Sequence, residues 1–190
     1  LFVLSGILVM NAQTTKGKFM IAGSSGLDFI AETQKYKTNH GDGTSGKLLQ
    51  ISIDPQAGWF VMDNLAAGLI LEMNYEGYKA DGAEHRESVT YFVLAPFARY
   101  YFGTTKIRPF AEASVGLGPK FVKYEVMDGV EKDETLLFAL QLKGGAAFFM
   151  SDNFSLEMSL GYRYLSDRYD SDYRDVNSDF MIQAGFTVYW

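Results

Sequence analysis

The alternation of apolar and polar residues is the strongest pattern along this chain of 190 residues. In residues 154–164, FSLEMSLGYRY, apolar side chains take every second position, and Ser, Glu, Gly and Arg fill the positions between them. Successive side chains of a strand point to opposite faces, so this segment predicts a strand with one apolar and one polar face. Seven more segments share this character. The eight predicted strands are residues 17–30, 47–61, 65–78, 88–102, 107–122, 134–150, 154–166 and 178–190.

The connections between these segments alternate in length. Residues 62–64, 103–106 and 151–153 are short and carry turn-forming residues, whereas residues 31–46, 79–87, 123–133 and 167–177 are longer and rich in charge. We expect the longer connections to be solvated loops. An even number of strands joined in this way predicts an all-β fold, an antiparallel up-and-down barrel of eight strands.

The composition of the polar face indicates whether water or lipid surrounds the predicted barrel. The apolar rows contain no charge, and the opposite rows mix Gly, Ser and Ala with few lysines. In a soluble lipocalin-like barrel that binds a small apolar ligand, this polar row would be the solvated surface, which is normally richer in charge. The row suits the narrow lumen of a transmembrane barrel better. The predicted lumenal charge network is Asp54, Glu72, Arg99, Arg108, Glu112, Lys143, Glu157 and Arg163.

The aromatic residues of the apolar rows collect at the strand ends. One group lies beside the short turns and the other beside the longer connections, as the two lipid–water interfaces of a membrane barrel require. The predicted aromatic girdle is Trp59, Phe102, Phe148 and Trp190 at the first interface, with Tyr75, Tyr162 and Tyr164 at the second. This sorting favours a transmembrane β-barrel over the soluble alternative.

Four prolines lie inside the periodic segments: Pro55, Pro96, Pro109 and Pro119. Each would cost about 3 kcal/mol in a helix interior, which argues against a helical fold. Proline also lacks the N–H that a paired strand needs, so we expect these residues near strand ends or bulges.

Composition excludes several classes of function. A formal net charge of −6 disfavours nucleic acid as a partner, because binding phosphates requires a basic surface. The absence of cysteine excludes disulfides and thiolate metal sites. Residues 1–10, LFVLSGILVM, followed by Asn-Ala-Gln, are typical of a secretory signal peptide, although a buried N-terminal strand is the alternative. We therefore expect residues 1–13 to be removed and residues 14–190 to form the barrel domain.

Taken together, the export signal, the eight amphipathic segments, the alternating turns and the terminal FTVYW make the chain similar to the small outer-membrane β-barrel family, of the OmpX and OmpA-membrane-domain kind. The resemblance implies a monomer without cofactors in the outer membrane of a Gram-negative bacterium. It also implies partners: outer-membrane lipid and lipopolysaccharide, and an extracellular protein bound through the loops. Phe186, Val188 and Trp190 match the family's alternating C-terminal pattern, which the barrel assembly machinery recognises.

The charged lumen could conduct ions or could act as a plug, and we expect a plug because buried charges must pair. Hairpin geometry about residues 103–106 predicts Arg99 opposite Phe110 and diagonal to Glu112, and we expect an Arg99–Glu112 pair. The same row carries large rings that would leave no diffusive pore: Phe97, Tyr101, Phe110, Phe149 and Tyr189.

Catalysis and calcium binding are two alternatives to the interpretation of the charged connections as solvated loops. His40 and His85, with nearby acids and serines, would be the base candidates of an outer-membrane lipid-modifying enzyme. The GDG at 41–43 and the acidic residues 167–175 could bind Ca²⁺, but neither has the ligand spacing of a known calcium loop. We therefore expect no catalytic residues and no metal site.

Overall fold

The computed structural model of the chain describes residues 14–26, 32–38, 41–80, 86–126, 129–168 and 174–190. These residues form one antiparallel sheet, and no helix among them is long and apolar enough to cross a membrane. The strands are β1 (Phe19–Gly26), β2 (Glu32–Thr38), β3 (Gly41–Met62), β4 (Leu65–Ala80), β5 (Arg86–Tyr101), β6 (Ile107–Val126), β7 (Gly129–Ser151), β8 (Phe154–Arg168) and β9 (Arg174–Tyr189).

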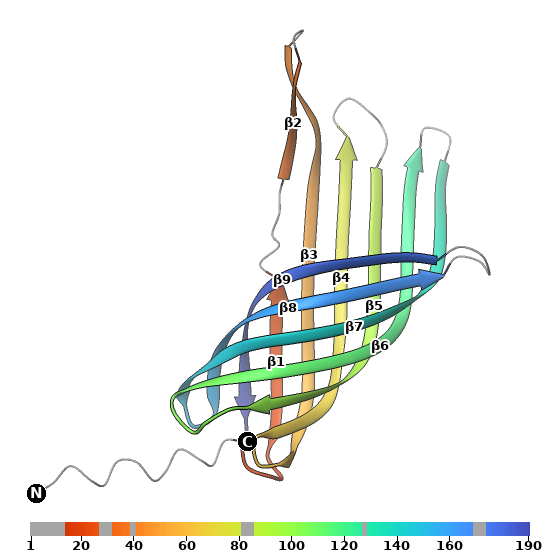
Figure 1. The fold of residues 1–190 in the computed structure, drawn as a ribbon. Coiled ribbons are helices and arrows are strands. Elements are labelled where there is room, and N and C mark those ends of the chain that lie inside the picture. Colours follow the sequence, from red (N-terminus) through yellow and green to blue (C-terminus); the bar gives the residue numbers. More distant parts are fainter. Residues whose placement is uncertain (1–13, 27–31, 39–40, 81–85, 127–128, 169–173) are drawn as a thin grey trace, which may run out of the picture.

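The sheet closes on itself because β1 pairs with both β9 and β3. Met20 lies opposite Tyr189 on one side, and Phe19 lies opposite Trp59 on the other. Among the described strands, β2 pairs with the beginning of β3 and projects beyond the ring (Figure 1). Eight strands, β1 and β3 to β9, therefore make the closed wall, which confirms the predicted eight-stranded up-and-down barrel.

The prediction that the longer connections are loops was wrong over much of their length. Strand β2 and the first residues of β3 occupy most of residues 31–46, and β6 and β7 continue as a paired hairpin to Val126 and Gly129. At about 3.3 Å per residue, the 22 residues of β3 span about 70 Å, well beyond a hydrocarbon core of about 30 Å. The hairpins thus extend out of one end of the barrel (Figure 1). Their strands need no apolar face there, so the apolar alternation used to predict strands ends before the strands do.

The prolines lie deeper in the wall than the sequence suggested. Pro55, Pro96 and Pro119 all fall inside strands, at β3, β5 and β6. Pro96 lies opposite Leu69 of β4, while the residue pairing between β5 and β6 is interrupted between Leu94 and Phe97. The expected placement near ends or bulges was wrong for these three. Each lies where the pairing with one neighbouring strand is interrupted while the pairing with the other continues, so the wall accommodates a residue that has no N–H.

The register of the β5–β6 hairpin also differs from the prediction. Arg99 lies directly opposite Glu112, and Phe110 lies opposite Tyr101. The connection runs over residues 102–106, and Phe102 N–H donates to the carbonyl oxygen of Pro109 at 2.8 Å. This longer connection shifts the pairing by two residues and places the two charged side chains face to face.

Candidate functional site

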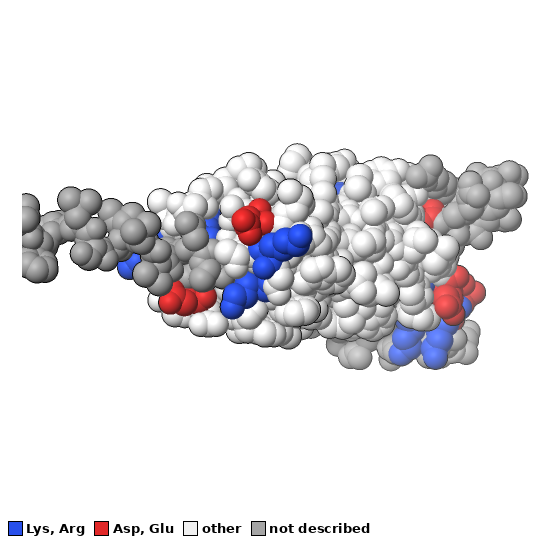
Figure 2. Space-filling model, turned by 90° about the horizontal axis from the view of Figure 1, so that it is seen from below, with Lys and Arg blue, Asp and Glu red and all other residues white. Residues whose placement is uncertain are grey.

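The wall of the barrel is apolar outside and polar inside. Along β7, Leu142 is 51% exposed on the outer face, whereas its neighbour Gln141 is 2% exposed and points inward. The same alternation continues around the ring, and the visible face in Figure 2 carries its charges toward two ends with an almost uncharged middle. Exposed apolar side chains in such numbers are unfavourable in water, where continuous apolar patches rarely exceed a few hundred Å². The outer face therefore contacts lipid, and the soluble lipocalin-like alternative does not fit.

The predicted girdle residues all lie on the outer face. Trp59, Phe102, Trp190, Tyr75 and Tyr162 are exposed, and Phe148 and Tyr164 are half-buried in the same rows. Several of these rings have an aromatic neighbour: Phe19 stacks on Trp190 with centroids 6.3 Å apart, and Tyr162 meets Phe180 at 5.4 Å. The role of these rings at the membrane interfaces stays a prediction.

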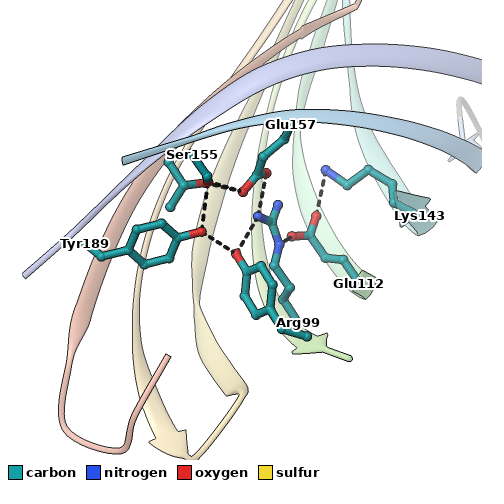
Figure 3. A network of polar contacts seen from close by, with 8 residues as sticks. Arg99, Glu112, Lys143, Ser155, Glu157 and Tyr189 are labelled. Atoms are coloured by element: carbon teal, nitrogen blue, oxygen red, sulfur yellow. Dashed lines mark hydrogen bonds and ion pairs between the residues drawn. The ribbon is translucent and has the colours of Figure 1, made fainter. Parts of the chain in front are cut away.

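The centre of the lumen holds four ionic side chains, here called the Arg99 network: Arg99, Glu112, Lys143 and Glu157 (Figure 3). Arg99 Nε donates to Glu112 Oε2 at 2.6 Å, and Arg99 Nη1 donates to Glu157 Oε2 at 2.7 Å. Lys143 Nζ lies 2.6 Å from the second oxygen of Glu112. Four strands supply these groups, and each is buried, so the pairs bridge the barrel interior.

Hydroxyl groups extend this network toward the C-terminal strand. Thr187 Oγ1 donates to Glu157 Oε1 at 2.6 Å, and Ser155 Oγ lies 3.0 Å from the hydroxyl of Tyr189. The hydroxyls of Tyr189 and Tyr101 share a hydrogen bond of 3.2 Å, and Arg99 Nη1 donates to Tyr101 at 3.1 Å. Figure 3 shows the resulting chain of contacts across the lumen. A fully paired arrangement of this kind satisfies charges that would otherwise be costly to bury.

An aromatic floor, made of the rings of Phe60, Tyr101, Phe110, Phe149 and Tyr189, lies in the lumen between the Arg99 network and the short turns. Tyr101 lies 5.9 Å from Phe110 and 6.0 Å from Phe60, and Tyr189 lies 5.2 Å from Phe149, all between ring centroids. The sequence placed every one of these rings in the lumen except Phe60. Phe60 follows the outward Trp59, and that alternation was the signal that could have located it. The guanidinium of Arg99 sits over the Phe110 ring at 4.5 Å.

At the short-turn mouth, residues that precede β1 bind the adjacent turn and the barrel wall. Thr14 is 2% exposed, receives a 2.7 Å hydrogen bond from Arg108 Nη1 and donates to Asn64 Oδ1 at 2.5 Å. The backbone N–H of Asn64 returns a bond to the carbonyl oxygen of Thr14 at 2.7 Å. Asn64 has a φ of 65°, a left-handed turn conformation that asparagine tolerates. Sequence reasoning grouped Arg108 with the lumenal charges and did not identify Thr14.

The upper lumen, the part between the Arg99 network and the end from which the long hairpins extend, holds the other predicted charges. These charges do not join the Arg99 network. Asp54 accepts a 2.6 Å bond from Gln183 Nε2. Arg163 pairs with Asp179 through two bonds of 3.1 and 2.8 Å. Glu72, 2% exposed, has no hydrogen-bond partner among the described atoms. The eight predicted charges are thus all lumenal, but the structure divides them among the network, the short-turn mouth and the upper lumen.

The long-hairpin mouth opens into a cavity of about 320 Å³. Its wall includes Lys120, whose Nζ lies 2.6 Å from Asp167 Oδ2, and Arg163, which also donates to the Tyr91 hydroxyl at 2.7 Å. This end is therefore polar and open, in contrast to the aromatic floor at the other end.

The remaining candidate residues fall in two groups. Phe186, Val188 and Trp190 alternate on the outer face of β9, each at least 36% exposed, and their role in assembly stays a prediction. His40, His85 and residues 1–13 lie outside the described residues, as does most of the acidic segment after Arg168. Within the described part of the chain, no three His, Asp or Glu side chains are grouped so that they could hold a metal ion.

The closed ring and its apolar outer face define a transmembrane β-barrel of the small outer-membrane class. The chain belongs to the family described as protein of unknown function (DUF3575), whose model matches residues 55–190. No curated protein matches the chain.

Solved structures of outer-membrane proteins share this fold. Ail, the attachment invasion locus protein of Yersinia pestis, superposes with a TM-score of 0.55 at 10% identity, covering 93% of this chain and 100% of that one. Ail in complex with the heparin analogue sucrose octasulfate gives a TM-score of 0.54 at 12% identity, with the same coverage. OprG from Pseudomonas aeruginosa gives 0.50 at 13% identity, covering 94% and 98%. Identities this low establish the common fold alone. Together with the lipid-facing wall, that fold places the chain in the outer membrane.

Proposed function

We propose that this protein is a non-enzymatic outer-membrane barrel that holds its long hairpins outside the cell and whose lumen is closed to diffusing solutes. The observation that carries the proposal is the Arg99 network above the aromatic floor. Paired charges and then packed rings lie one after the other along the lumen, and this succession supports a closed interior. Eight strands enclose only enough room for side chains, so little space remains for a water-filled path.

Planar-bilayer recording tests the closed lumen directly. The purified monomer should show no stable, sizeable conductance. As a matched comparison, the double substitution Tyr101→Ala and Tyr189→Ala removes two rings of the floor and one bridge of the hydroxyl chain. Short current steps that appear in this variant alone would support the floor as the barrier. Steps of porin size from the unmodified protein would contradict the proposal.

The hairpin surface supports an interaction role because rigid strands carry it beyond the membrane. Binding loops are commonly held by a rigid scaffold in this way. The described part of this surface carries Glu87, Glu131, Asp133 and Glu134 beside Lys123 and Lys132. Such a mixed, acid-rich surface differs from what a polysulfate such as the Ail ligand would require. A protein partner, or lipopolysaccharide bridged by cations, suits it better.

Orientation can be tested by labelling because the chain contains no cysteine. Glu131→Cys introduces a thiol on the β7 end of a long hairpin, and Thr104→Cys introduces one in the short turn between β5 and β6. A membrane-impermeant maleimide should label the first variant on intact cells and the second only after the outer membrane is permeabilised. Labelling in the opposite order would reverse the proposed orientation.

The two ends of the chain concern export and assembly of the barrel. We expect the mature protein to begin near Gln13, so that residues 14–190 form the inserted domain, and N-terminal sequencing of the membrane fraction measures this. We also propose that the barrel assembly machinery recognises the alternating Phe186, Val188 and Trp190. Replacing Trp190 with Ser should lower the amount of folded, heat-modifiable barrel, whereas replacing Ser178 with Ala at the far end of β9 should not.

A further inference from the structure

The cavity at the long-hairpin mouth is lined by both apolar and polar side chains. It measures about 320 Å³, within the range of small-molecule sites, and its wall includes Asn74, Glu76, Val89, Tyr91, Leu137 and Leu165. The apolar members and the ring of Tyr91 offer a surface for hydrocarbon. The polar members from β4 offer acceptor oxygens.

The cations of the cavity are already used by acids of the same wall. Lys120 pairs with Asp167 at 2.6 Å, and Arg163 pairs with Asp179 and also binds the Tyr91 hydroxyl. Glu76, half-buried on the lumenal face of β4, has no cationic partner among the described side chains. Its cross-strand neighbour is Gln50, which is uncharged and lines the same cavity. One carboxylate of the cavity therefore remains without a counter-charge.

A second, independent feature lies beside it. Asn74 is 5% exposed and lines the cavity, yet its Oδ1 has no hydrogen-bond partner among the described atoms. One step deeper on the same face, both oxygens of Glu72 are also without a partner. Lys143 and Arg163 act on Glu72 electrostatically, but their own bonds go to Glu112 and Asp179. A buried acceptor left unpaired is costly, so this line of oxygens requires a donor.

We propose that the cavity binds a small organic ammonium ion. Its N–H groups would donate to Asn74 Oδ1 and to the carboxylate of Glu76, and its hydrocarbon part would lie against Val89, Leu137 and Leu165. An organic cation fits better than a metal ion because the described residues offer no three-acid cluster and because Val89, Leu137 and Leu165 give part of the wall an apolar surface. The site lies outside the Arg99 network, so the proposal is independent of whether the lumen is closed.

Nuclear magnetic resonance of the refolded full chain in detergent micelles tests the site. The probe is butylammonium chloride, with 1-butanol as the neutral analogue and sodium chloride at the same ionic strength as the inorganic cation. Butylammonium should shift the Asn74 side-chain amide and the β4 backbone around it in a saturable manner. Glu76→Gln should weaken the apparent affinity about tenfold or more, the scale of one charge-assisted hydrogen bond. Glu87→Gln, an exposed acid on the adjacent strand, should leave it unchanged.

Asn74→Asp provides a second variant that works in the opposite direction, because a second carboxylate in the cavity should tighten butylammonium binding. This variant decides the matter if Glu76→Gln does not fold. The proposal is overturned if no saturable shift occurs, if butanol or sodium produces the same saturation, or if Glu76→Gln binds as well as the unmodified chain. Shifts spread over lipid-facing residues alone would show partition into the micelle and would also overturn it.

Discussion

The outer face and the lumen are built from alternate residues of the same strands, yet they follow opposite rules. On β7, Leu140 and Leu142 are exposed to lipid, while Gln141 and Lys143 between and beside them are at most 6% exposed. Contacts of the outer face with lipid are non-directional, so any apolar side chain serves. Contacts in the lumen join particular atoms, such as Arg99 Nε and Glu112 Oε2. Adding a charge to the outer face, or removing one from the lumen, should therefore lower the free energy of unfolding.

The largest effect should come from removing Arg99. Arg99→Met provides an unbranched apolar side chain but leaves buried Glu157 without a cationic partner and leaves Glu112 with Lys143 alone. Breaking a buried pair by removing one partner typically costs about 3 to 5 kcal/mol, and we expect a loss of this size in the free energy of unfolding. Urea titration of the barrel in lipid vesicles measures it.

A double-mutant cycle with Glu112→Gln separates the pair from the rest of the network. The combined variant should lose less stability than the sum of the two single variants, because the second substitution removes a carboxylate that the first has deprived of one of its two cations. Additive losses would show that Arg99 and Glu112 do not depend on each other, and the close contact between them would then carry no energetic weight.

The next largest effect should come from placing a charge on the outer face. Leu140 lies in the lipid-facing row of β7, and Leu140→Arg should lower the free energy of unfolding by a few kcal/mol, up to the value of about 4 kcal/mol that arginine costs at the bilayer midplane. The matched control is Leu140→Phe, which keeps the site apolar and should change stability little. If both substitutions were neutral, Leu140 would not face lipid, and the assignment of inside and outside would be wrong.

The barrel itself could be predicted from sequence because alternation is a local property. Apolar rows with polar positions between them, such as the row from Leu136 to Leu142, predicted the number of strands and both faces of the wall. The hairpin extensions were missed because strands outside the membrane need no apolar row. Pairing within the lumen was harder still. Arg99 and Glu157 are 58 residues apart, and only the closed ring brings them together. Thr14 gave no signal at all, since a lone threonine before a strand has no distinguishing pattern.

Packing in the lumen gives a third, smaller test. Gly68 lies opposite Gly58, and a Cβ at position 68 would collide with the Ala57 carbonyl oxygen and the Gly58 Cα of the neighbouring strand, and would approach Phe97 Cε1 to 2.8 Å. Gly68→Ala should therefore force the ring or the backbone to move, with a loss of about 1 to 3 kcal/mol in the free energy of unfolding. Gly144→Ala on the outer face, where a new methyl group would meet only a carbonyl oxygen 4.0 Å away, is the control and should be close to neutral. Equal losses for the two would mean that strand conformation, and not the filling of the lumen, sets the cost.

The smallest effect should come from the ion pair at the open mouth, even though its chemistry matches that of the Arg99 network. The side chain of Asp179 is 35% exposed, and the cavity it lines is open toward solvent. Arg163→Met would leave Asp179 in contact with water, where an unpaired carboxylate costs little. We therefore expect a loss of about 1 kcal/mol or less in the free energy of unfolding, as for exposed pairs, measured by the same urea titration as Arg99→Met.

Raising the salt concentration should reduce this loss further. It should leave the loss for Arg99→Met nearly unchanged, because the partners of Arg99 are buried and are screened much less. A loss for Arg163→Met as large as that for Arg99→Met would show that the upper lumen is as dry as the centre, and the open cavity would then have to be closed in the membrane.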